Sequence, residues 1–257
     1  MLRQELGRLA LALQFLTRVP VRIASFEPAE LNRCARWFPL VGTLVGAFGA
    51  GIFLFATAWW PLPVAVLLSM AATVWLTGGF HEDGLADTCD GLGGAVARER
   101  ALEIMKDSRL GSYGALGLVL TLALKTALLL ALAQDAPLRA ALAMVLAHAV
   151  SRAAAVGLMA TLPYAGDIEH AKAKPLAQRV TTAELLVGYG TTAVLSAASG
   201  PLLGWPSLAL ALVLAAFVAA WINRWLRRRL GGFTGDALGA TQQWCEAAVL
   251  LGLAAAH

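Results

Sequence analysis

Seven of the 16 acidic residues in this 257-residue chain fall within one short stretch. They are Glu82, Asp83, Asp87, Asp90, Glu99, Glu103 and Asp107. Asp83, Asp87 and Asp90 are spaced i, i+4 and i+7, so a helix would carry all three on one narrow face. A cation relieves the repulsion among such carboxylates, and oxygen donors without a His/Cys cluster favour Mg²⁺, Mn²⁺ or Ca²⁺ over zinc. Gly84 and Gly91 leave room beside this face for a phosphate. The pattern predicts a site for a divalent cation and a phosphate.

A solvated acidic face is the alternative interpretation of this stretch. Such a face normally mixes in basic residues, yet no Lys or Arg occurs between His81 and Ala97. Further along, Asp107 is a fourth candidate metal ligand, and Lys106 and Arg109 are candidates for binding phosphate.

The residues between these two groups mix signs at helical spacing. For Glu99, Arg100 and Glu103 we therefore expect a solvated or self-paired helix face.

Other polar residues interrupt apolar runs, where they are costly. Arg152 lies near one end of its run and is a candidate for reaching a phosphate, whereas His148 fits a packed, hydrogen-bonded residue. Lys125 lies in the middle of another run, and Glu246 is one candidate for its ion-pair partner. Asp236 follows a glycine-rich turn at a predicted helix start and is a further candidate substrate-binding residue.

The elements that must position these residues are long apolar helices. The chain is 59% hydrophobic and 14% charged. Seven apolar runs approach or exceed the length needed to cross a hydrocarbon layer of about 30 Å. They are residues 38–60, 62–80, 110–133, 140–162, 185–203, 205–223 and 237–256. The sequence predicts an all-α polytopic integral membrane protein of six or seven transmembrane helices, forming a single membrane domain over residues 1–257.

Two shorter patterns complete the predicted helices. Leu6, Leu9, Leu13 and Leu16 recur at helical spacing, which indicates an N-terminal helix lying in the membrane interface and not a secretory signal. The pair of glycines at positions 42 and 46 favours close helix packing. The three cysteines lack metal-type spacing and fit small apolar fillers.

The distribution of basic residues predicts the orientation in the membrane. Threading the seven runs from a cytoplasmic N-terminus places 17 of the 20 Lys and Arg residues on one side. This asymmetry explains the net charge of +4 without a nucleic-acid partner. The acidic segment, residues 78–114, is then expected at the cytoplasmic face.

Two classes of function fit a polytopic protein with these residues. The first is metal-assisted phosphoryl or nucleotidyl transfer at the acidic segment. The second is a transporter in which Lys125, Arg152 and Glu246 form an ion pathway. The carboxylates cluster at a helix end and not at the bilayer midplane, which favours the enzyme.

Four segments carry a resemblance to a known family. They are 78–91 (GGFHEDGLADTCDG), 106–114 (KDSRLGSYG), 231–236 (GGFTGD) and 39–42 (PLVG), in the expected order. Together they resemble the cobalamin synthase family, the adenosylcobinamide-GDP ribazoletransferases of vitamin B12 assembly.

The resemblance implies a multi-pass enzyme of the bacterial or archaeal inner membrane that uses Mg²⁺. It implies transfer of adenosylcobinamide-GDP to α-ribazole or its 5′-phosphate, with release of GMP, and it leaves the oligomeric state open. Asp83, Asp87 and Asp90, with Glu82 and Asp107 as further candidates, would hold Mg²⁺ against the diphosphate. Lys106 and Arg109 would stabilise phosphate charge.

The attacking hydroxyl of ribazole also needs a base. His81 and Glu82 are the candidates, with Glu82 preferred because a helix points it away from the three aspartates.

A second resemblance supplies the alternative. Residues 87–91 (DTCDG) are similar to the start of the CDP-alcohol phosphotransferase signature, which makes a phospholipid synthase the runner-up. The Ala-Arg pair and the second pair of aspartates of that signature are missing here.

Overall fold

The computed structural model describes residues 2–21, 28–166 and 180–255, and in these ranges the chain is helical without strands. The helices are α1 (Leu2–Leu16), α2 (Pro28–Arg33), the 3-10 helix η1 (Cys34–Trp37), α3 (Phe38–Thr57), α4 (Leu62–Thr77), α5 (Phe80–Gly93), α6 (Arg98–Lys106), α7 (Ser112–Asp135), α8 (Pro137–Thr161), α9 (Thr182–Leu203), α10 (Trp205–Arg229) and α11 (Gly235–Ala254). Arg22, Lys172, Lys174 and Arg179, which the sequence places on the cytoplasmic side, lie outside the described residues.

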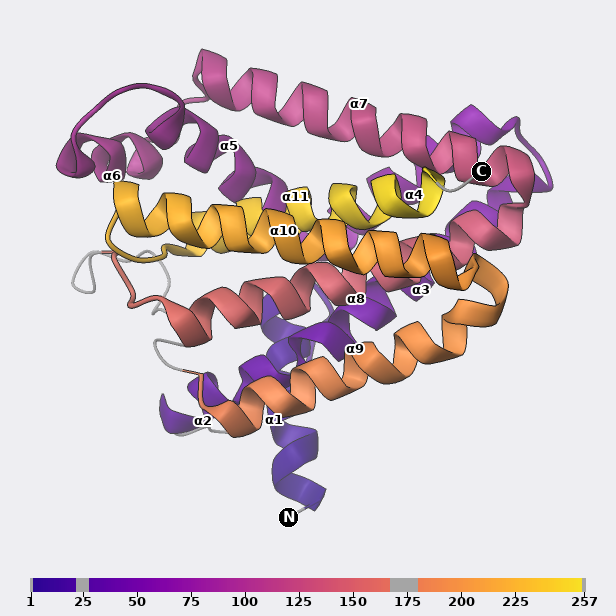
Figure 1. Cartoon of the computed structure of the whole chain (residues 1–257), viewed down its shortest axis with the longest axis horizontal. Coiled ribbons are helices and arrows are strands. Elements are labelled where there is room, and N and C mark those ends of the chain that lie inside the picture. Colours follow the sequence, from indigo (N-terminus) through magenta and orange to yellow (C-terminus); the bar gives the residue numbers. More distant parts are fainter. Residues whose placement is uncertain (1, 22–27, 167–179, 256–257) are drawn as a thin grey trace.

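The long helices confirm the expected all-α polytopic membrane fold. Five described stretches are long and apolar enough to cross a bilayer, namely 30–57, which includes α3, and helices α7, α8, α9 and α10. Helices α4 and α5 together are also long and apolar enough, but their axes meet at 88°, so they make a sixth only if they are counted as one broken span. The long helices run side by side in Figure 1, with α5, α6 and the start of α7 gathered at one end.

The bend between α4 and α5 rests on two glycines. Gly78 and Gly79 both have left-handed backbone conformations, with φ of 76° and 71°. Side chains are unfavourable in this region, so the pair ends α4 and starts α5 in a new direction. The Gly79 amide donates to the Val74 carbonyl at 2.9 Å, which closes the last turn of α4.

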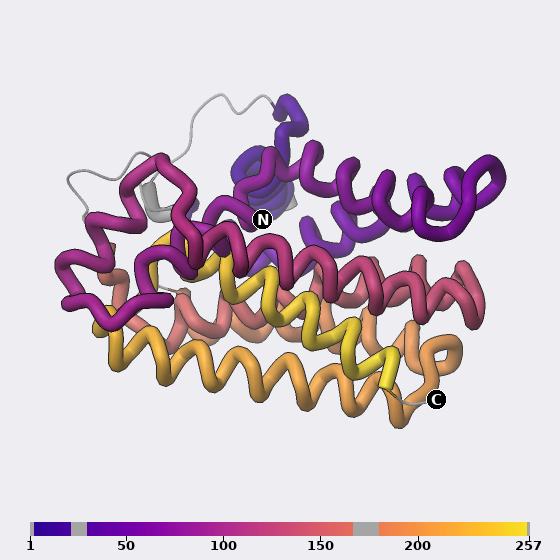
Figure 2. Tube along the Cα trace, turned by 90° about the horizontal axis from the view of Figure 1, so that it is seen from above, coloured from indigo at the N-terminus to yellow at the C-terminus, as the bar shows by residue number. Residues whose placement is uncertain are grey.

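Helices α8 and α11 occupy the centre of the bundle. Helix α11 contacts α10, α8, α5 and α7, and Figure 2 shows it running between α7 and α10. The expected close packing at Gly42 and Gly46 is confirmed on α3. A Cβ at Gly46 would lie 2.7 Å from the Val145 Cα, and one at Gly42 would collide with the His148 carbonyl of α8. The missing side chains therefore let α3 lie directly against α8.

Helix α1 confirms the predicted N-terminal helix and packs against η1 and α3. Leu11 and Leu16 are buried, while Leu6 is exposed. Charged contacts fix the helix in place: Arg8 Nε donates to Glu30 Oε2 at 2.5 Å, and Trp37 Nε1 donates to Glu5 Oε2 at 3.1 Å. The helix is thus attached to the start of the first long span.

Candidate active site

Helix α5 carries the predicted acidic face. Asp83 is exposed, Asp87 and Asp90 are partly exposed, and Gly84, which follows the first of them, is buried. All three aspartates lie within one uninterrupted helix, so the i, i+4, i+7 spacing does place them on one side of it. The face lies at the end of the bundle where α6 and the start of α7 also lie (Figure 1).

Asp90 binds the first turn of α7. Its two carboxylate oxygens accept hydrogen bonds from the backbone amides of Gly111 and Gly114, each at 2.8 Å. A Cβ at either glycine would collide with this carboxylate. The amides at a helix start lack partners within the helix, and a carboxylate there also interacts favourably with the helix dipole. Asp90 therefore anchors α7 to α5.

Asp236 lies next to α5 because Gly84 has no side chain. A Cβ at Gly84 would lie 2.8 Å from the Asp236 carbonyl oxygen and 3.0 Å from its Cα. Gly239, one turn along α11, approaches the His81 carbonyl in the same way. Thr234 caps α11 by accepting a hydrogen bond from the Ala237 amide at 3.1 Å. The two glycines thus let the start of α11 rest on the acidic helix.

Lys106 and Arg109 lie on the connection from α6 to α7. Lys106 is the last residue of α6 and is exposed. The Arg109 side chain is 86% exposed and forms a two-pronged contact with Asp107, with Nη2 to Oδ2 at 2.5 Å and Nε to Oδ1 at 3.0 Å. These hydrogen bonds lower the pKa of Asp107 to about 2, so the pair is ionised at neutral pH.

The predicted metal ligands do not converge on one point. No three His, Cys, Asp or Glu side chains in the described ranges lie close enough together to share an ion. Asp90 is bonded to α7, and Asp107 is bonded to Arg109. The donor chemistry still fits a hard cation where α5 meets α11, because Asp83 and Asp87 of α5 and Asp236, whose backbone adjoins Gly84, offer carboxylate oxygens and no nitrogen or sulfur.

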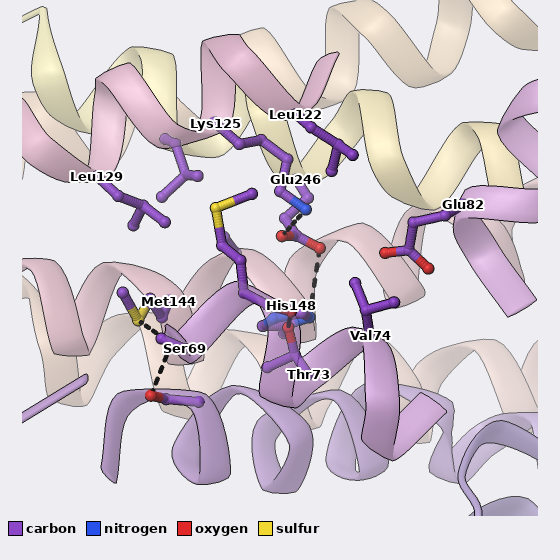
Figure 3. A pocket seen from close by; sticks show the side chains of 14 residues that line it. Ser69, Thr73, Val74, Glu82, Leu122, Lys125, Leu129, Met144, His148 and Glu246 are labelled. Carbon is purple, nitrogen blue, oxygen red and sulfur yellow. Dashed lines mark hydrogen bonds and ion pairs between the residues drawn. The ribbon is translucent and has the colours of Figure 1, made fainter. Parts of the chain in front are cut away.

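His81 and Glu82 lie on other sides of α5 from the exposed Asp83. His81 is 4% exposed, and its ring packs edge-on against Phe80 with centroids 5.4 Å apart. The Glu82 carboxylate points toward the bundle interior (Figure 3). There, Oε1 accepts a hydrogen bond from Gln243 Nε2 at 2.9 Å. The sequence expectation that Glu82 points away from the aspartates therefore agrees with the structure.

Arg152 is not brought together with Lys106 and Arg109. It is 2% exposed, and its Nη1 donates to the His148 carbonyl at 3.1 Å and lies 3.1 Å from His148 Nδ1. The expectation that His148 is packed and hydrogen-bonded is confirmed. Arg152 is buried beside it, so the structure does not place the Arg152 side chain where the sequence analysis expected it to reach a phosphate.

The ion pair anticipated within the membrane is present. Lys125 Nζ lies 2.5 Å from Glu246 Oε1, with both side chains buried. A transport pathway would need such groups to exchange partners. Here they are closely paired, and the adjoining cavity measures only about 20 Å³.

Two groups of residues escaped the sequence analysis. Gln242 and Gln243 are both buried and bonded to charged side chains, and their adjacency within an Ala-rich apolar run was the available signal. Arg229 donates to the carbonyls of Leu92 and Gly94 at the end of α5, at 3.1 and 2.8 Å. The sequence shows a cluster of basic residues at the end of this helix, but it does not show which backbone carbonyls they bind.

The fold and the acidic end of the bundle define a multi-pass membrane protein with a site suited to charged substrates. A family model for cobalamin-5-phosphate synthase matches residues 8–254, and the chain belongs to this family. A relative from Leptothrix cholodnii, named adenosylcobinamide-GDP ribazoletransferase, is 57% identical over 94% of this chain and 92% of its own. Relatives of the same name from Shewanella amazonensis and Shewanella oneidensis are 47% and 45% identical, over 97% and 95% of this chain and 95% and 92% of their own. No solved structure is significantly similar to the chain.

Proposed function

We propose that this protein joins adenosylcobinamide-GDP to α-ribazole or its 5′-phosphate and releases GMP, as the last step of cobalamin assembly. Membership of the family over nearly the whole chain supports this reaction, as do the names of the relatives. The observation that carries the proposal is the acidic face of α5 beside Asp236, at the end of the bundle that also presents Lys106 and Arg109.

We propose Mg²⁺ as the cofactor, held by Asp83 and Asp87 of α5 and Asp236 of α11. Bound there, it would neutralise the oxygens of the diphosphate. Asp83 and Asp87 lie one turn apart on α5, and the backbone of Asp236 on α11 adjoins Gly84 between them, so a hard cation bound there would meet carboxylate oxygens. Asp90 and Asp107 were also expected as ligands, but the contacts described above support other roles for them: Asp90 holds α7, and Asp107 orients Arg109.

Lys106 and Arg109 would hold the phosphates of adenosylcobinamide-GDP. Both are exposed beside α5, and the planar guanidinium of Arg109 already binds one carboxylate through two nitrogen atoms. A phosphate presents the same arrangement of oxygens to Arg109. The substrate would therefore compete with Asp107 for this side chain.

Glu82 is the proposed proton acceptor for the attacking hydroxyl. One of its oxygens accepts from Gln243, while Oε2 has no hydrogen-bond partner among the described residues. His81 is less suited because the whole residue is buried, whereas Glu82 is partly exposed.

The proposed location is the bacterial inner membrane, with the site at the cytoplasmic face. The basic residues at the ends of α6 and α10 lie at the same end of the bundle as α5, as the positive-inside rule would require of a cytoplasmic end. The long helices are then surrounded by lipid, and the polar substrates reach the site from the cytoplasm.

The test is conversion of adenosylcobinamide-GDP and α-ribazole 5′-phosphate by membranes containing the protein, with and without Mg²⁺. We expect Mg²⁺-dependent formation of adenosylcobalamin 5′-phosphate, identified by mass, with equimolar GMP. Membranes with the Asp83→Asn variant are the matched control. A folded wild-type protein that forms no product from verified substrates would contradict the proposal, and CDP-activated alcohols would then be the next substrates to assay.

A further inference from the structure

A chain of buried polar side chains connects α5 to the centre of the bundle. Glu82 begins the chain on α5, Gln243 and Glu246 continue it on α11, and Lys125 joins it from α7. Figure 3 shows three of these side chains, Glu82, Lys125 and Glu246. Lys125, Gln243 and Glu246 are 5%, 2% and 3% exposed. Burying so many polar groups among apolar helices is costly, which makes a functional role the first expectation.

Three contacts fix the side-chain amide of Gln243. Its Oε1 accepts a hydrogen bond from Lys125 Nζ at 3.1 Å. Its Nε2 donates to Gln242 Oε1 and to Glu82 Oε1, each at 2.9 Å. Turning the amide over would place its oxygen against two acceptors and its NH₂ group against the Lys125 ammonium. Lys125 therefore determines that Gln243 presents a donor to Glu82.

Lys125 is in turn fixed by Glu246. The ammonium lies 2.5 Å from Glu246 Oε1, while Glu246 Oε2 accepts from Gln242 and lies 3.3 Å from His148 Nδ1. The pair is thus neutral overall and held from several helices. Such a pair resists rearrangement, because separating buried charges leaves each without compensation.

The contacts leave one oxygen of Glu82 available. Oε2 is buried and has no hydrogen-bond partner within the part of the chain that the structure describes. The Glu82 side chain lines a cavity of about 20 Å³ together with Lys125, His148 and Glu246 (Figure 3). That volume has room for about one water molecule. Buried carboxylate oxygens are rarely left unpaired, so this atom is poised to accept a hydrogen bond or a proton.

We infer that Lys125 and Gln243 are positioning residues that hold Glu82 for its part in the transfer, an inference that rests on the proposed function. Gln243 holds Oε1, and Oε2 takes the proton. As the O–P bond to ribazole forms, the O–H bond of its hydroxyl breaks, and the proton passes through a water molecule in the adjoining cavity to the buried Oε2. The P–O bond to GMP breaks, and GMP leaves with that electron pair.

The test measures kcat and KM on purified protein in detergent, with Mg²⁺ at a fixed saturating concentration. Gln243→Glu keeps the shape of the side chain and an acceptor for Lys125, but in its ionised form it has no hydrogen to donate to Glu82. Gln243→Met removes both functions. We expect each to lower kcat about tenfold, with both KM values within about twofold of wild type, and Glu82→Gln to lower kcat about a hundredfold.

Lys125 is tested without leaving a buried charge unpaired. The double variant Lys125→Met with Glu246→Gln removes both charges of the pair, and we expect it to lower kcat about tenfold. Thr126→Val is the matched control, because Thr126 neighbours Lys125 on α7 but bonds to Leu122 and Met70, outside the chain of contacts. We expect this control to retain wild-type kcat. Gel filtration and thermal unfolding report whether each variant is folded.

A double-mutant cycle that combines Gln243→Met with Glu82→Gln distinguishes a positioning role of Gln243 from a merely structural one. If Gln243 acts through Glu82, adding Gln243→Met to Glu82→Gln causes no further loss of kcat. A further tenfold loss in that background overturns the inference, as does wild-type kcat in both Gln243 variants. Wild-type activity in Glu82→Gln would instead refute the proposed proton acceptor, and absence of product from the wild type would refute the proposed function.

Discussion

Asp83 and Asp90 lie on one helix face yet have different surroundings. Asp83 is exposed at the first turn of α5, while Asp90 receives two backbone amides from the start of α7. A carboxylate that caps a helix stabilises the folded protein in addition to supplying a negative charge. Residue chemistry alone therefore does not assign a common role to the three aspartates.

Substitution to asparagine separates the two roles. We expect Asp83→Asn and Asp87→Asn to abolish turnover while leaving membrane expression and thermal unfolding unchanged. Asp90→Asn should destabilise the protein by about 1 kcal/mol and lower turnover by loosening the start of α7, because the amide retains only one acceptor oxygen for two backbone N–H groups. Activity assays and thermal unfolding of the three variants give the comparison. Normal activity in both Asp83→Asn and Asp87→Asn would exclude this face as the metal site.

Glu103 provides the contrasting case of an acidic residue outside the site. It pairs with Arg100 at 2.8 Å, and both side chains are 66% exposed, as expected for a solvated face. Exposed pairs contribute little to stability. We expect Glu103→Gln to change unfolding by less than about 0.5 kcal/mol and to keep near-wild-type turnover, measured in the same assays. An inactive variant would extend the site to α6.

At the scale of elements, the site depends on how closely α5 approaches α11. The approach occurs at Gly84 and Gly239, where neither helix has a side chain to separate them. This contact sets where Asp236 lies relative to the acidic face. The distance between α5 and α11 thus depends on the absence of a Cβ atom at Gly84 and Gly239.

Gly84→Ala tests this contact. Its Cβ would meet the Asp236 backbone at 2.8 Å, so α5 and α11 must separate, and we expect a destabilisation of about 1–3 kcal/mol with a large loss of turnover. Gly51→Ala is the control on α3, where a Cβ meets nothing within 4 Å. Thermal unfolding and turnover are measured for both. Wild-type activity in Gly84→Ala would show that the close approach is dispensable.

Periodicity and run length predicted most of the elements, because a lipid solvent requires long, internally bonded helices. The side shared by the three aspartates followed from helical spacing, and the Lys125–Glu246 pair followed from the cost of isolated charges. Partners across helices could not be predicted in the same way. The amides that Asp90 binds and the bonds of Gln243 depend on which helix faces which, and the sequence pattern does not specify this.

At the scale of the whole molecule, arginines lie at both ends of the helix bundle. Arg98, Arg109 and Arg229 lie at the end that carries α5, whereas Arg139 lies at the start of α8 and reaches the Leu253 carbonyl near the end of α11. The long helices join the two ends. The sequence-based threading predicts the same separation of Arg139 from the other three arginines.

Labelling of introduced cysteines tests the orientation. Glu103→Cys places a thiol on α6, which precedes α7, and Asp135→Cys places one at the last residue of α7. Of the native cysteines, Cys34 and Cys245 are buried and Cys89 is only partly exposed. We expect a membrane-impermeant maleimide to label Glu103→Cys in inside-out vesicles and Asp135→Cys in intact spheroplasts. The unsubstituted protein gives the background. The reverse pattern would place the site outside the cytoplasm.

The central ion pair has a consequence for biosynthesis. Lys125 enters the bilayer with α7, but Gln243 is synthesised 118 positions later and Glu246 follows it. During that interval the ammonium lacks both of its final partners, at a cost of about 2.5–3.5 kcal/mol in lipid. The Leu-rich remainder of α7 offsets this cost during insertion. The bundle therefore acquires its polar centre only when the last long helix joins it, so the order of translation is also the order in which the site is completed.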